Sequence, residues 1–314
     1  MNQSSFMNQS SPFIQSPTIQ QVLSLASTHG LTLQGESLSL NESGLDFLVA
    51  IARDQTDNSW VLRIPRRSDV GEKAIYENRA LTLVSQHLPV AVPEWKVNTE
   101  QLIAYRLLPG TPAATIDPQV KQYQWHLDPA NLAAAFTTSL SHTLVALHSI
   151  DPKEAAQGGI RVTPAKGLRT TLQLKMEQVQ QEMGVCKALW QSWQEWVGED
   201  SYWPQHTSLV HGDLHAGHIL VDTQSRVSGL IDWTEAEVGD PAIDFVPYLA
   251  TFGQQALSTL LTGYEQAGGK VWPRMKEHIV RQQGAYGINI ALFALQSGVE
   301  EYLQMAKVAL GVDK

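Results

Sequence analysis

Only one cysteine, Cys186, occurs among the 314 residues, so no disulfide can form within the chain. The sequence also lacks an apolar run long enough to span a membrane, and it lacks the basic and apolar pattern of an export signal. Basic residues are few, 22 against 31 acidic ones, and the net charge of −9 disfavours non-specific binding to nucleic acid. We therefore expect a cytoplasmic monomer that acts on a small molecule, without nucleic-acid or membrane partners.

A glycine-rich phosphate loop of the form G-x-G-x-x-G is missing as well. The first turn between strand-like segments, Asn-Glu-Ser-Gly at 41–44, contains only Gly44, preceded by Ser43. An ordinary hairpin turn and a loop that covers nucleotide phosphates fit this short pattern equally well.

The pattern of apolar residues predicts an α+β protein in which a strand-rich part precedes a helical part. A polar repeat at 1–16 is typical of a disordered or variable tail. Helical patterns cover 17–30 and 68–86, and the chain after 128 is mainly helical. The remaining apolar runs predict five antiparallel strands, at 31–40, 45–53, 60–64, 93–97 and 102–107. We expect an N-terminal lobe at 17–108 and a helical lobe at 109–314.

The stretch from 208 to 245 carries the residues that indicate chemistry. It reads as strand, polar loop, strand, turn and strand, with Asp213 and His218 in the loop and Asp232 after the last strand. Phosphoryl transfer needs a carboxylate that orients the acceptor hydroxyl and takes its proton, together with ligands that hold magnesium. Asp213 suits the first role, whereas His218 and Asp232 suit the second.

Three histidines in the same loop also permit a zinc site. His211, His215 and His218 lie within eight residues, but the chain has no cysteine pair. The carboxylates of Asp213 and Asp232 fit magnesium and phosphate better. We therefore favour magnesium over zinc.

This stretch resembles the catalytic loop of the aminoglycoside-phosphotransferase and protein-kinase superfamily, which carries H-x-D-x-x-x-x-N followed by D-F-G or I-D-W. His211, Asp213 and Ile231-Asp232-Trp233 match, while His218 replaces the usual asparagine. That replacement is similar to the macrolide 2′-phosphotransferase branch, as are the segments 41–47, 61–67, 272–278 and 298–302. The resemblance implies a two-lobed, protein-kinase-like fold. It also implies transfer of phosphate from GTP or ATP, with Mg²⁺, to the 2′-hydroxyl of a macrolide amino sugar, which inactivates the antibiotic.

The resemblance further implies how the first lobe binds nucleotide. Arg63 occupies the strand position of the family lysine, and Glu77 is its expected partner on the following helix. Ser43 and Gly44 would cover the phosphates, and the backbone of the hinge at 104–106 would bind the purine. The hinge residues are Ala104, Tyr105 and Arg106.

Three further residues are expected to support the catalytic loop. The resemblance gives His148 and Asp244 bracing roles, and Asp240 suits the N-cap of the helix that begins at Pro241.

The sequence leaves the acceptor and the tryptophans open. A kinase of an aminoglycoside or of a choline-like alcohol is an alternative, and so is a nucleotide-binding pseudokinase. Trp190, Trp193 and Trp196 share one helix face, which predicts packing and permits a second role in lining an apolar acceptor pocket.

Overall fold

The computed structural model describes residues 17–41, 44, 46–67, 70–117 and 122–312, so the predicted tail at 1–16 lies outside the described residues. The chain forms two compact units. One comprises the chain up to Asn78 together with Pro93–Leu108, and the other comprises Arg79–Val92 and Pro109–Lys314. Residues 79–92, which the sequence placed in the first lobe, therefore pack with the second unit. Within the described ranges, no helix is both long and apolar enough to cross a bilayer.

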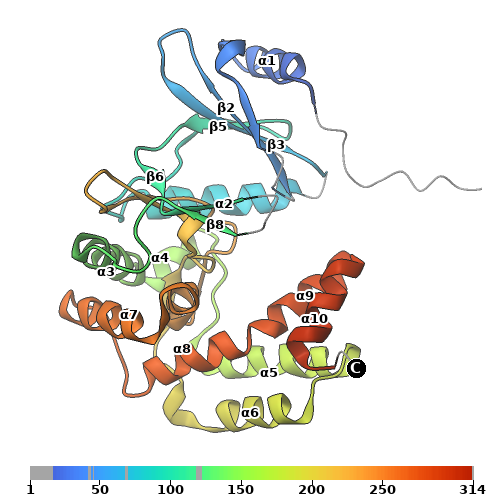
Figure 1. The fold of residues 1–314 in the computed structure, drawn as a ribbon, viewed down its shortest axis with the longest axis vertical. Helices are drawn as coiled ribbons and strands as arrows, with labels where there is room; N and C mark the ends of the chain where they lie inside the picture. The colour runs from blue at the N-terminus through green and yellow to red at the C-terminus, as the bar shows by residue number, and fades with distance from the viewer. Residues whose placement is uncertain (1–16, 42–43, 45, 68–69, 118–121, 313–314) are drawn as a thin grey trace, which may run out of the picture. The chain divides into compact units, whose positions relative to one another are not determined.

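The first unit is built on a five-stranded antiparallel sheet, which confirms the predicted α+β class (Figure 1). Its strands run in the order β1-β2-β3-β5-β4. Their bounds are Ser39–Asn41 for β1, Phe47–Arg53 for β2, Ser59–Pro65 for β3, Trp95–Asn98 for β4 and Ile103–Arg106 for β5.

Alternation along these strands gives the sheet two apolar faces. Helix α1 (Ile19–Thr28) packs on one face, which includes Leu48, Leu62 and Ala104. The start of helix α2 (Val70–Val84) packs on the other face, against residues such as Phe47 and Ile103. Because successive side chains of a strand point to opposite faces, both helices could be expected from the sequence.

The strand predicted at 31–40 is largely absent. A 3₁₀ turn, η1 (Gly35–Ser37), interrupts it, and only Ser39–Asn41 joins the sheet. The hydroxyl of Ser37 donates to the carbonyl of Gln34 and accepts from the N–H of Arg53, at 2.8 Å each. A serine side chain thus replaces part of the β ladder, a competition that apolar periodicity does not reveal.

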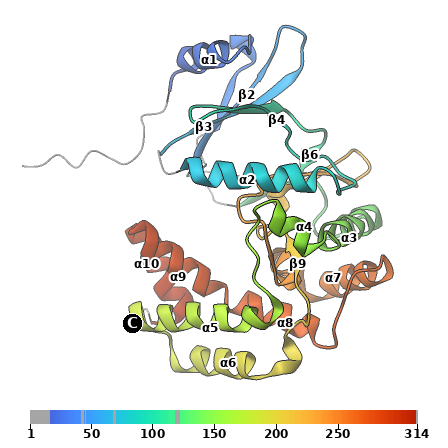
Figure 2. The same ribbon diagram turned by 180° about the vertical axis from the view of Figure 1, so that it is seen from behind.

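The second unit is mainly helical (Figures 1 and 2). Its α-helices, apart from the end of α2, are α3 (Ala134–His148), α4 (Pro152–Gln157), α5 (Ala165–Glu182), α6 (Lys187–Gly198), α7 (Val246–Gln266), α8 (Met275–Gly284), α9 (Tyr286–Ser297) and α10 (Glu300–Leu310). Its 3₁₀ turns are η2 (Asp200–Tyr202), η3 (Ala216–His218) and η4 (Pro241–Phe245). Buried residues of α5, α6, α9 and α10 form one apolar core.

Three small sheets position the catalytic stretch within this unit. Strands β6 (Thr111–Pro112), β10 (Ile219–Val221) and β11 (Val227–Leu230) form one sheet. Strands β7 (Ala114–Ile116) and β8 (Tyr123–Trp125) form another, and β9 (Ser208–Val210) pairs with β12 (Glu237–Gly239). The predicted hairpin is β10–β11, whereas β9 pairs with β12.

Candidate active site

The loop between β9 and η3 requires a glycine at its second residue. Gly212 has φ +84°, and a Cβ atom added there would lie 2.4 Å from the carbonyl oxygen of Glu235. A side chain would therefore meet both an unfavourable backbone conformation and a hard clash. The glycine lets the loop turn tightly against the segment before β12 and places Asp213 at its tip.

Asp244 of η4 holds the backbone of this loop through hydrogen bonds. Its carboxylate accepts the N–H groups of His211 and Gly212, each at 2.9 Å, and Nε2 of His148 donates to it at 3.1 Å. His148 in turn contacts the Tyr264 hydroxyl at 2.9 Å. Burial alone would raise the pKa of Asp244, but the hydrogen bond and charge of His148, together with the backbone hydrogen bond from His211, hold that pKa below its usual range. The bracing roles expected for His148 and Asp244 are thus visible as contacts.

His211 connects the loop to the short segment that follows β11 and leads to Asp232. Its Nε2 donates to the carbonyl of Ile231 at 3.0 Å, and its Nδ1 accepts the N–H of Asp213 at 3.3 Å. Complete burial lowers its pKa, so the ring is neutral. With both nitrogens occupied, His211 has no lone pair left for a metal.

The side chains of His218 and Asp232 face each other. Nδ1 of His218 donates to the carbonyl of Asp213 at 2.9 Å, which leaves Nε2 as the lone-pair atom of a neutral ring. That Nε2 lies 3.7 Å from Oδ2 of Asp232. Two acceptor atoms that face each other need a proton or a cation between them. Two ligands of one Mg²⁺, each about 2.1 Å from it, lie roughly 3–4 Å apart, so this pair fits the ion.

Asp232 reaches this position through an unusual backbone. It has φ +64°, a left-handed conformation that few residues other than glycine adopt. Its Oδ1 accepts the Thr234 hydroxyl at 2.7 Å. Strain of this kind occurs at sites where a side chain must be aimed, and here it directs the carboxylate toward His218.

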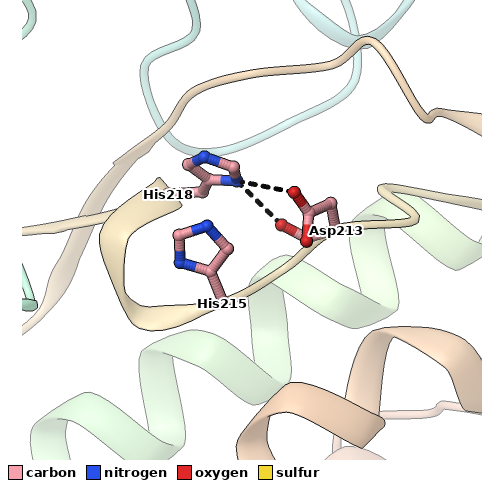
Figure 3. A group of neighbouring side chains, drawn as sticks. All are labelled: Asp213, His215 and His218. Atoms are coloured by element: carbon pink, nitrogen blue, oxygen red, sulfur yellow. Dashed lines mark hydrogen bonds and ion pairs between the residues drawn. The ribbon is translucent and has the colours of Figure 1, made fainter. Parts of the chain in front are cut away.

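Figure 3 shows Asp213, His215 and His218 pointing toward one another. Their ligand atoms all lie within 4.8 Å of one another. However, Nδ1 of His215 accepts the N–H of Gly217 at 3.0 Å, and Nδ1 of His218 donates to a carbonyl. To offer Nδ1 to a metal, His215 would have to give up the hydrogen bond from Gly217, and His218 would have to change tautomer, so the group as arranged favours the pair of His218 and Asp232. Burial, followed by the charge of His218, lowers the pKa of His215 to about 4.

Asp213 also lines a cavity of about 850 Å³ within the second unit. Its lining includes four carboxylates, those of Asp213, Glu235, Glu237 and Asp240, and the cations Arg161 and Lys175. Much of the rest of the lining is apolar and aromatic, and includes Trp196, Trp203, Ile290, Phe293, Tyr302 and Met305.

The cavity contains residues to which the sequence assigned no binding role. Glu235 lies just before β12 and Glu237 begins it, and this spacing after Asp232 is the signal that could have indicated them. Asp240 caps η4, as expected, by accepting the N–H of Ala242 at 3.0 Å, but it also faces the cavity. Of the three tryptophans on α6, Trp196 lines this cavity, while Trp193 is buried in the apolar core.

In the first unit the predicted ion pair is present. Nη1 of Arg63 lies 2.7 and 2.8 Å from the two carboxylate oxygens of Glu77, and both residues are buried. The Arg63 guanidinium lies 4.2 Å from the centre of the Phe47 ring. Gly44 is exposed, and Ser43 lies outside the described residues.

The predicted hinge coincides with strand β5. Ala104 and Tyr105 pair with β3 on one side and with β4 on the other, so the ladders already use their backbone groups. Arg106 closes the strand and donates to Asp54 at 2.7 Å. Purine contacts through Ala104 and Tyr105 would require these ladders to open.

The chain is similar to known proteins along most of its length. The model of the phosphotransferase enzyme family APH matches residues 37–278. The uncharacterized protein YcbJ of Bacillus subtilis (strain 168) is 47% identical over 294 residues, which cover 94% of this chain and 96% of that protein. The macrolide 2′-phosphotransferase MphH of Brachybacterium faecium has a TM-score of 0.88 at 36% identity, with 94% of this chain and 98% of that chain covered. A macrolide 2′-phosphotransferase type I has a TM-score of 0.87 at 40% identity, with coverage of 95% and 98%.

Proposed function

Because the chain belongs to the phosphotransferase enzyme family, we propose that it transfers the γ-phosphate of GTP or ATP to the 2′-hydroxyl of the amino sugar of macrolide antibiotics. This transfer would inactivate the antibiotic. The observation that carries the proposal is the cavity of about 850 Å³, because its lining combines Asp213 with large aromatic side chains. The similarity to two macrolide 2′-phosphotransferases over nearly the whole chain supports it.

The cavity suits a macrolide in both of its parts. A macrolide is a large and mostly apolar ring, which matches walls made of aromatic and aliphatic side chains. Its amino sugar carries a dimethylammonium group next to the reacting hydroxyl. Carboxylates outnumber cations in the lining of the cavity, so the cationic amino sugar is favoured there.

Asp213 would act as the base in the proposed reaction. Its carboxylate accepts the hydrogen bond of the 2′-hydroxyl, aligns the oxygen with the γ-phosphorus and takes the proton as the new P–O bond forms. The N–H of Asp213 donates to His211, and the two preceding N–H groups donate to Asp244, so three hydrogen bonds hold the backbone of the loop that carries the base. A base that is already positioned lowers the cost of reaching the reactive geometry.

His218 and Asp232 would hold Mg²⁺. The ion, when bound, would screen the charge of the nucleotide phosphates. The facing acceptor atoms of the two side chains, 3.7 Å apart, support this assignment. In the first unit, Glu77 holds the Arg63 guanidinium that we assign to the phosphates. Ser43 and Gly44 remain our candidates for the turn over the phosphates, and Arg106 with the residues after it for the purine.

The reaction needs cytoplasmic nucleotide, so we place the enzyme in the cytoplasm. Asp213, His218 and Asp232 come from one chain, and this supports activity as a monomer.

Purified protein incubated with Mg²⁺, erythromycin and either GTP or ATP tests the proposal. Mass spectrometry should show a single added phosphate on the macrolide, and the two initial rates give the donor preference. Kanamycin and choline serve as parallel acceptors. Phosphorylation of either of these, with erythromycin unchanged, would refute the macrolide assignment. The absence of any product from a folded, nucleotide-binding protein would favour a pseudokinase.

A further inference from the structure

His278 lies at the end of the segment 272–278 and is completely buried, yet the proposed reaction gives it no role. It belongs to α8 and is surrounded by indole rings. The centres of the Trp196, Trp203 and Trp272 rings lie 5.3, 4.9 and 5.8 Å from that of its imidazole. A polar ring in such surroundings must have partners for both nitrogens.

The two nitrogens of His278 have different partners. The indole N–H of Trp196 donates to Nδ1 at 3.0 Å, so Nδ1 carries the lone pair and the proton sits on Nε2. Nε2 then donates to Oδ2 of Asp240 at 2.6 Å. Gln282 donates to the same oxygen at 2.7 Å. His278 therefore joins an indole to a carboxylate in one fixed order of donor and acceptor.

Both partners line the acceptor cavity. Trp196 stacks on Trp203 with ring centres 5.4 Å apart and planes 14° from parallel, and both rings contribute to the cavity wall. Asp240 also lines the cavity. The imidazole thus connects an aromatic and a charged side chain of the cavity lining.

The same chain of contacts reaches the catalytic loop. Oδ1 of Asp240 caps η4 through the N–H of Ala242, and η4 carries Asp244, which holds the N–H groups of His211 and Gly212. Asp213 follows directly. Through these hydrogen bonds, a displacement of the Trp196 ring would shift the loop that carries the proposed base.

We propose that His278 is a positioning residue of the acceptor site, which fixes the Trp196 wall and the Asp240 carboxylate relative to Asp213 and so determines how well a macrolide fits. This inference rests on the proposed function. It predicts that variants of these residues change the KM for the acceptor and leave that for the nucleotide unchanged, because Trp196 and Asp240 both line the acceptor cavity.

Trp196→Phe tests the inference, because it removes the indole N–H and keeps an aromatic ring in the wall. Trp193→Phe is a matched control on the same helix, since the indole N–H of Trp193 is buried without a hydrogen-bond partner. We expect Trp196→Phe to raise the KM for erythromycin about five- to tenfold, the size of one lost hydrogen bond, with the nucleotide KM unchanged. Trp193→Phe should change neither KM.

His278→Gln keeps a donor for Asp240 and should also raise the erythromycin KM. If the two residues act through one contact, the double variant should be no worse than His278→Gln alone. Thermal unfolding of each variant identifies loss of fold, which would lower the active fraction and kcat and leave both KM values in place.

Equal erythromycin KM values for Trp196→Phe and Trp193→Phe, or a parallel rise in the nucleotide KM, would overturn the inference alone. A wild-type protein that phosphorylates no macrolide would overturn the proposed function and this inference together.

Discussion

Individual residues of the site combine a chemical group with a backbone position that few residues tolerate. Asp232 is left-handed at φ +64°, and Gly212 at φ +84° has no room for a side chain. Gly212 directly precedes the proposed base, and the strained Asp232 is itself a proposed metal ligand.

Asp213→Asn should lower kcat by about 10³-fold or more, because the amide can accept a hydrogen bond from the acceptor hydroxyl but takes no proton. Steady-state kinetics with erythromycin measures this loss, and calorimetric titration with nucleotide should give nearly the wild-type affinity. A parallel loss of nucleotide affinity would contradict the assignment of Asp213 as the base.

His218→Asn should change the preference between metals. Imidazole suits softer divalent ions, whereas an amide oxygen suits magnesium, so the rate with Mn²⁺ relative to Mg²⁺ should fall several-fold in the variant. His215→Asn is the control, because the His215 Nδ1 is engaged with Gly217 and the substitution should leave this ratio unchanged. Complete inactivity of His218→Asn with both ions, in a folded protein, would show that His218 does more than bind metal.

Asp244→Asn should lower the free energy of unfolding by about 3 kcal/mol at pH 7, since it removes a buried, hydrogen-bonded charge. The pKa of Asp244 is lowered in the folded protein, so its stabilisation is present above the unfolded value of 3.8 and is lost as the pH falls through the lower folded value. Urea unfolding should therefore show a constant difference in the free energy of unfolding between wild type and variant from pH 7 to pH 5, and this difference should shrink only below about pH 4. A difference that disappears near pH 6 would indicate titration of a histidine instead.

At the scale of elements, short strands and 3₁₀ turns place the chemistry. β9 pairs with β12 and β10 pairs with β11, and the loop before η3 lies between these two ladders. Each strand has only three or four residues, so the arrangement depends on the turn residues that connect them.

Gly212→Ala should disrupt this arrangement. The added methyl group would lie 2.4 Å from the Glu235 carbonyl oxygen, so the loop must move and kcat should fall at least 100-fold. Gly268→Ala is the matched control, since Gly268 also has positive φ but has open space around its Cβ position. The control should cost about 1 kcal/mol of stability, measured by urea unfolding, and leave kcat in place. Similar kcat values for the two variants would show that the clash is unimportant.

The elements themselves were predicted unevenly from the sequence. Helix α1 lies within the helical pattern predicted at 17–30, and its start has a complete capping box, in which Thr18 accepts from the N–H of Gln21 and Gln21 accepts from that of Thr18. The pairing of β9 with β12 was not predicted, because runs of three apolar residues do not state which strand lies beside them.

At the scale of the whole molecule, each of the two units contains a different part of the proposed machinery. The first unit holds Arg63 and Glu77, and the second holds the base, the metal ligands and the acceptor cavity.

Expression of the protein in a macrolide-sensitive bacterium should raise the inhibitory concentration of erythromycin at least fourfold, while that of kanamycin stays unchanged. Expression of Asp213→Asn at the same level should leave both antibiotics fully active, because protection requires turnover. Protection by the Asp213→Asn protein would indicate that the chain sequesters the drug without modifying it.

The sequence by itself determined the α+β class, the five-stranded sheet and the candidates Asp213, His218 and Asp232, because strand alternation and motif spacing are local properties of the chain. It also indicated the partnership of Arg63 and Glu77. Only the tertiary structure decided that residues 79–92 pack with the second unit and that η1 interrupts the first strand. The structure alone also revealed the contacts of His278. Those contacts join residues far apart in the sequence, and such pairs meet only after helices and strands have packed.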